Sequence, residues 1–127
     1  MMNVFLIDDD ATFIFLTKRV IKNTGIEAGI FEFANGRHAI DHLLNNHDDK
    51  ALMPDIIFLD LSMPVMDGWE FLEEYEALPP GIEKAPLYIL SSSISPHDIN
   101  LARLHPAVSD FLIKPITKEK ILQLCKG

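Results

Sequence analysis

The chain has 127 residues, 48% of them hydrophobic, so it is long enough to bury one core without metal ions or disulfides. Its formal net charge of −8 disfavours direct contact with nucleic-acid phosphates or anionic lipid. No apolar run approaches the ~20 residues that a membrane span needs, no leader peptide opens the sequence, and the one cysteine, Cys125, has no internal partner. These features predict one cytoplasmic domain over residues 1–127, with no output domain and no nucleic-acid or membrane binding.

Five short apolar runs alternate with helical patterns along the chain. They cover residues 4–7, 30–33, 56–59, 87–90 and 108–113. The first, third and fourth runs are uninterrupted, which is typical of strands buried on both faces of a parallel sheet. The second contains Glu32 and the fifth contains Ser109 and Asp110, so these two are expected to be edge strands.

The segments between the runs predict five helices. Asp10 is a good N-cap for a first helix that presents Phe13, Leu16 and Val20 to the core. Four further starts with their inward residues are Asn35 or Gly36 (Ile40, Leu43, Leu44), Asp67-Gly68 (Phe71, Leu72, Tyr75), Ser95-Pro96, and Thr117 (Ile121, Leu124). Strict alternation of five strands and five helices predicts a doubly wound α/β sandwich.

Polar side chains follow four of the five predicted strands, at the sheet edge where open α/β sheets bind ligands. Asp8 and Asp9 follow the first, Asp60 the third, Ser91 the fourth and Lys114 the fifth. Two carboxylates ~4 Å apart repel each other by on the order of 4 kcal/mol at an effective dielectric of 20. A fold tolerates such repulsion when a cation binds, and ligands that are all oxygen suit Mg²⁺.

These residues, in this order, resemble the receiver domain of two-component response regulators, over essentially the whole chain. The stretches that carry the resemblance are Phe5 to Asp10, Asp60 to Gly68, Leu90 to Ser93, and Phe111 to Pro115. The second stretch, D-x-x-M-P-x-M-D-G, is the most specific, because it is long and mixes unlike residue types.

The resemblance implies a flavodoxin-like sheet of order 2-1-3-4-5 and assigns roles to the clustered residues. Asp60 would be the phosphoacceptor, with Lys114 and Ser91 contacting the phosphoryl group. Asp9, Asp60 and the backbone carbonyl of Ser62 would bind Mg²⁺ directly, and Asp8 would bind it through water. Ser91 and Phe111 would form the switch, and the Lys114–Pro115 peptide would be cis.

The same resemblance implies the partners. A sensor histidine kinase or a phosphotransfer protein would donate the phosphoryl group from a phosphohistidine, and an unknown downstream protein would read the result. The chain would be a monomer or a phosphorylation-dependent dimer. It would catalyse only its own phosphorylation and slow autodephosphorylation, so it is not a conventional enzyme.

Two other functions remain open at this point. Asp8-x-Asp10-x-Thr12 is literally the opening motif of haloacid-dehalogenase-type phosphatases, in which Asp8 would be the nucleophile. The Asp60 stretch would then have no explanation, and no acidic motif follows Lys114. A pseudo-receiver, an interaction module that is never phosphorylated, usually lacks an acid or the lysine, and all of them are present here.

Overall fold

One sheet of five parallel strands forms the middle of the molecule. The computed structural model describes residues 2–63, 66–92 and 95–125, so Pro64, Val65 and Ser93 of the motifs above lie outside the described residues. The strands are β1 (Met2–Ile7), β2 (Ala28–Phe33), β3 (Ile56–Leu59), β4 (Leu87–Ser91) and β5 (Asp110–Ile113). Their order, β2-β1-β3-β4-β5, confirms the expected flavodoxin-like sheet and its two edge strands.

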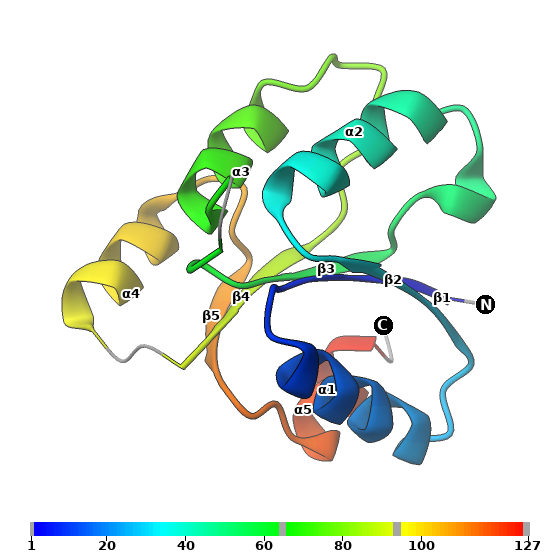
Figure 1. Ribbon diagram of the computed structural model, residues 1–127, viewed down its shortest axis with the longest axis vertical. Helices are drawn as coiled ribbons and strands as arrows, with labels where there is room; N and C mark the ends of the chain where they lie inside the picture. The colour runs from blue at the N-terminus through cyan, green and yellow to red at the C-terminus, as the bar shows by residue number, and fades with distance from the viewer. Residues whose placement is uncertain (1, 64–65, 93–94, 126–127) are drawn as a thin grey trace.

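Helices cover both faces of this sheet (Figure 1). α1 (Ala11–Asn23) and α5 (Lys118–Cys125) lie on one face. α2 (Gly36–Asn46), α3 (Gly68–Glu76) and α4 (Pro96–Leu104) lie on the other, and a short 3₁₀ helix, η1 (Lys50–Leu52), precedes β3. Among the described residues, no helix is both long and apolar enough to cross a membrane.

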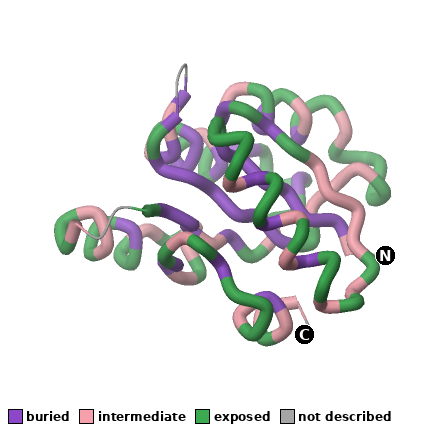
Figure 2. The backbone as a smooth tube through the Cα atoms, turned by 60° about the horizontal axis from the view of Figure 1, so that its bottom comes forward, coloured by how far each residue is buried: buried purple, intermediate pink, exposed green. Residues whose placement is uncertain are grey.

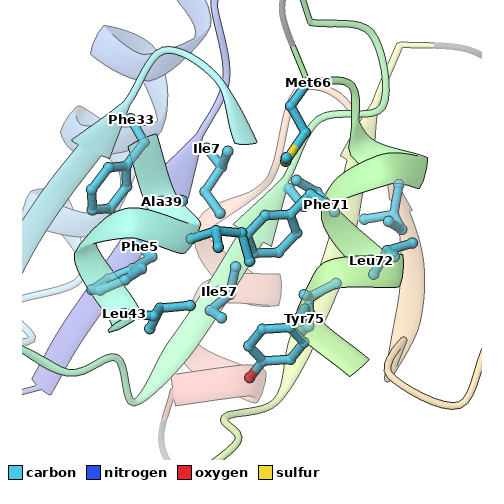
Figure 3. Packing of buried hydrophobic residues seen from close by; sticks show 14 of the residues in the cluster. Phe5, Ile7, Phe33, Ala39, Leu43, Ile57, Met66, Phe71, Leu72 and Tyr75 are labelled. Atoms are coloured by element: carbon cyan, nitrogen blue, oxygen red, sulfur yellow. The ribbon is translucent and has the colours of Figure 1, made fainter. Parts of the chain in front are cut away.

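The alternation of side chains along each strand divides the core into two hydrophobic clusters. Val4 and Leu6 of β1 belong to the cluster under α1 and α5, whereas Phe5 and Ile7 belong to the cluster under α2, α3 and α4. Because both faces are covered, most residues of the central strands β1, β3 and β4 are buried, as the purple parts of the tube show (Figure 2). In the cluster under α2, α3 and α4, the Phe71 side chain of α3 lies between α2 and α3 and points toward the sheet (Figure 3).

Most helices begin where the capping signals predict. The Asp10 carboxylate accepts the N–H groups of Thr12 and Phe13 at the start of α1. Asp67 and Glu70 form a reciprocal capping box on α3. Asn35 caps α2 through the N–H of His38, Pro96 is at the first position of α4, and the Thr117 hydroxyl accepts the N–H of Lys120 before α5.

The predicted inward face of the first helix was right only in part. Val20 is half-buried and packs against the core, but the fully buried residues are Ile14, Thr17 and Ile21, and Leu16 is 42% exposed. Residues 13–16 are all apolar, so two adjacent stripes satisfy the helical spacing equally well and only the docking of the helix decides between them. Leu44 of α2, also expected inside, is exposed for the same reason, since Leu43 beside it is the buried residue.

Gly68 brings the start of α3 against the loop that follows β3. Its N–H donates to the carbonyl of Leu61 at 3.0 Å. A Cβ at this position would stand 2.7 Å from both the Asp60 carbonyl oxygen and the Leu61 Cα. Because both are backbone atoms, a side chain cannot be accommodated without moving the loop that carries Asp60.

Gly68→Ala should therefore destabilise the protein by about 1–3 kcal/mol, as overpacking does in other tight sites. Urea unfolding measures the change. Gly81→Ala is the matched control, because nothing lies within 4 Å of its added Cβ; it should leave stability unchanged or raise it by up to about 1 kcal/mol. Equal effects of the two substitutions would contradict the packing described here.

Candidate functional site

Three carboxylates converge beyond the carboxyl ends of β1 and β3. Asp8 and Asp9 directly follow β1, and Asp60 directly follows β3 with its N–H donating to the carbonyl of Ile7 at 2.8 Å. One carboxylate oxygen from each of the three lies within 4.8 Å of the others. Asp8 and Asp60 are only 8% exposed, whereas Asp9 faces solvent. The parallel pairing of β1 with β3 thus places the three acids side by side.

Lys114 enters this cluster from the end of β5. Its Nζ lies 2.7 Å from Asp8 Oδ2 and 3.6 Å from Asp60 Oδ1, and its side chain is 4% exposed. Its backbone N–H donates to the carbonyl of Ser91 at 2.9 Å, which ties it to the end of β4. The Lys114–Pro115 peptide is cis, as expected from the resemblance.

The other predicted site residues lie around this cluster at different depths. Ser91 is buried at the last position of β4. Ser62 is exposed, and its backbone N–H donates to the Asp60 carboxylate. Phe111 does not line the polar pocket: its side chain is 6% exposed and belongs to the hydrophobic cluster under α2, α3 and α4.

Burial raises the pKa of Asp60 to about 6, and the negative charges of Asp8 and Asp9 add to the rise. The positive charge of Lys114 and the hydrogen bond from Ser62 act in the opposite direction and do not cancel it. Asp60 is therefore mostly ionised at neutral pH, but it is less favourable as an anion than an exposed aspartate. Three carboxylates with one ammonium group leave excess negative charge, which suits a divalent cation with oxygen ligands.

An open groove of about 400 Å³ lies beside α1 and reaches two acids of the cluster. Asp8 and Asp9 line it together with Lys18 and Glu32. Lys18 and Glu32 form an exposed ion pair at 2.7 Å across this groove. A reactant larger than water can therefore approach Asp9 from the α1–β2 side.

One residue near the site has the predicted place and one does not. Asp10, the second acid of the phosphatase-like motif, caps α1 through the N–H groups of Thr12 and Phe13, as its sequence position predicts. Phe13, expected to face the core, lies with its ring centroid 4.3 Å from Lys114 Nζ. No local pattern could have indicated this contact, because the two residues are 101 positions apart and meet only when α1 packs near the segment that follows β5.

The chain is similar to known proteins over nearly its whole length. The family model of the response regulator receiver domain matches residues 4–126. The chemotaxis protein CheY of Thermotoga maritima is 27% identical over 121 residues, which cover 94% of this chain and 91% of that protein. A two-component response regulator from Cytophaga hutchinsonii has a similar structure, with a TM-score of 0.87 and 30% identity over 99% of this chain and 95% of that one. The phosphorylated cyanobacterial phytochrome response regulator RcpA gives a TM-score of 0.77 and 28% identity over 99% and 89%.

The raised pKa of Asp60 predicts a pH-dependent effect of Asp60→Asn on stability. Well below the ordinary aspartate pKa of about 4, the carboxyl group is protonated in both folded and unfolded states, so it costs nothing on folding. As pH rises from about 4 to about 6, the unfolded chain loses this proton while the folded state still holds it, so stability is lost over that interval and does not change further above it. Asp60→Asn should therefore stabilise the protein by on the order of 2 kcal/mol more at about pH 8 than at about pH 4.

Urea unfolding of both proteins at the two pH values measures this difference. Asp48→Asn is the control, because that side chain is 95% exposed and its replacement should change stability little at either pH. A stability gain from Asp60→Asn that is independent of pH would contradict the unfavourable ionisation of Asp60.

Proposed function

This chain belongs to the response regulator receiver domains, and on that premise we propose that Asp60 accepts a phosphoryl group from a phosphohistidine. The donor is a sensor histidine kinase or a phosphotransfer protein in the cytoplasm. The observation that carries the proposal is the convergence of Asp8, Asp9, Asp60 and Lys114 at one edge of the sheet.

We further propose that the acidic cluster binds Mg²⁺. The donor set suits this ion, because carboxylate oxygens from three residues lie within 4.8 Å of one another. Asp9, Asp60 and the backbone carbonyl of Ser62 would hold the ion directly, and Asp8 would hold it through a water molecule. When bound, Mg²⁺ would neutralise the acids and bind oxygens of the incoming phosphoryl group.

In the proposed reaction, a carboxylate oxygen of Asp60 attacks phosphorus. The bond between phosphorus and the donor imidazole breaks, its electron pair returns to the ring nitrogen, and an acyl phosphate forms on Asp60. Lys114, which already lies 3.6 Å from Asp60 Oδ1, would pair with the transferred oxygens, and the Ser91 hydroxyl would donate a hydrogen bond to them. Water would later hydrolyse the acyl phosphate slowly in the same pocket, so the chain would act catalytically only on itself.

The proposed switch involves Ser91 and Phe111. The phosphoryl group adds about −1.5 to −2 charges beside the buried end of β4. A conformation that brings Ser91 and Lys114 closer to this charge would gain population by the difference in contact energy. Since Phe111 is already buried, its part in the change would be a repacking within the core rather than a move out of solvent. The surface of residues 95–125 would then present the signal to a downstream protein or to a second copy of the chain.

The alternatives have less support. The phosphatase hypothesis needs Asp8 as nucleophile, yet Asp8 pairs with Lys114 at 2.7 Å and the second acid of its motif caps a helix. The family match over residues 4–126 also favours the receiver. A pseudo-receiver has no specific observation in its favour, since every acid and the lysine are in the cluster.

Incubation with acetyl phosphate and Mg²⁺ tests the proposal. Intact mass should increase by one phosphoryl group, and the gain should be absent without Mg²⁺ and in Asp60→Asn, because the nucleophile and the ion are both required. Reduction with borohydride followed by peptide mapping should locate the acyl phosphate at Asp60. A reduced residue at position 8 would support the phosphatase instead, and no adduct on a folded, Mg²⁺-loaded protein would support the pseudo-receiver.

A further inference from the structure

An aromatic ring occupies one side of the lysine in the acidic cluster. The ring centroid of Phe13 lies 4.3 Å from Lys114 Nζ, within the range of a cation–π interaction. We propose that Phe13 is a positioning residue for Lys114. The Phe13 ring holds the Lys114 ammonium group at the pocket while Asp8 and Asp60 bind a cation. This inference rests on the function proposed above and adds a residue to it.

Lys114 has almost no access to water, so its charge must be solvated by the protein. Its side chain is 4% exposed, with Asp8 at 2.7 Å and Asp60 at 3.6 Å. Both of these acids belong to the cluster that suits a divalent cation. Once a cation draws their charge, the face of the Phe13 ring is a partner for which the cation does not compete.

The start of α1 fixes the ring in place. The Asp10 carboxylate accepts the N–H groups of Thr12 and Phe13, which holds residue 13 in the first turn. The same helix is anchored to the sheet by Ile14 and Ile21. Phe13 also borders two small voids of about 10 Å³ each, one shared with Asp8 and Asp60 and one shared with Lys114. Each void has room for about one water molecule, too little to hydrate the ammonium group without the ring.

Among the described residues, two other cation–π contacts are longer than the one between Phe13 and Lys114. Arg19 lies 5.8 Å from the Phe15 ring and Lys84 lies 5.9 Å from the Tyr75 ring, and both cations belong to exposed residues. The interaction at Phe13 is shorter, and its cation is desolvated, the condition under which cation–π attraction is strongest.

Phe13→Leu removes the aromatic ring but keeps an apolar side chain of similar size, so it tests the cation–π interaction apart from the packing of the side chain. In the wild-type protein, NMR should show the side-chain methylene protons of Lys114 shifted upfield by the ring current of Phe13, and Phe13→Leu should abolish this shift. Phosphorylation by acetyl phosphate with Mg²⁺ should slow about 2- to 30-fold. Phe13→Tyr and Phe13→Trp should restore both properties. Phe15→Leu, two residues along the same helix and 57% exposed, is the matched control and should change neither.

A Phe13→Leu protein that is folded and phosphorylated at the wild-type rate would overturn the inference, and so would Phe13→Tyr that is as slow as Phe13→Leu. If leucine prevents folding, Phe13→Met makes the same comparison with an unbranched side chain. Failure of the wild-type protein to be phosphorylated would refute the proposed function instead, while the NMR shift would still report whether the ring lies over Lys114.

Discussion

The repulsion among Asp8, Asp9 and Asp60 is the constraint on which the rest of the site depends. β1 is hydrogen-bonded to β2 on one side and to β3 on the other, so the ends of β1 and β3 cannot move apart without breaking the sheet. Two charges at such separations repel by on the order of 4 kcal/mol at an effective dielectric of 20. Lys114 offsets part of this repulsion, yet the pKa of Asp60 remains raised to about 6. The edge of the sheet thus carries a cluster of excess negative charge, which suits a cation.

Several parts of the fold contribute to holding that cluster rigid. The hydrophobic clusters on both faces of the sheet fix the strands from which the acids project. Gly68 lets the start of α3 press against the backbone at Asp60 and Leu61. On the other face, α1 brings Phe13 over the lysine. Asp60, its neighbouring acids and Lys114 are therefore positioned by separate elements, and a change in any of these elements affects the same pocket.

The sequence pattern was sufficient to predict the five strands, the five α-helices and the gathering of the three acids with Lys114, because buried parallel strands are continuous apolar runs and their carboxyl ends share one edge. The order of the strands within the sheet came from the family resemblance. The sequence was insufficient where the buried face of an element depends on how that element packs against the rest of the fold. In α1 two adjacent apolar stripes competed, and the sheet selected the one with Ile14 and Ile21. The 3₁₀ helix before β3 is held by Asn3, whose side-chain amide donates to the carbonyls of Ala51 and Met53 at 3.0 and 2.8 Å. Because Asn3 and its partners are about 50 residues apart, no local sequence pattern predicts these hydrogen bonds.

The most direct test of this account is the free energy of unfolding of the wild-type protein with Mg²⁺ and with a chelator at neutral pH. If the folded cluster binds the ion and the unfolded chain does not, Mg²⁺ at about ten times its dissociation constant should add about 1.4 kcal/mol. The increment should disappear in Asp9→Asn, whose exposed carboxylate is the most accessible of the three. Equal stability with and without Mg²⁺ would contradict the claim that the three acids form a cation site.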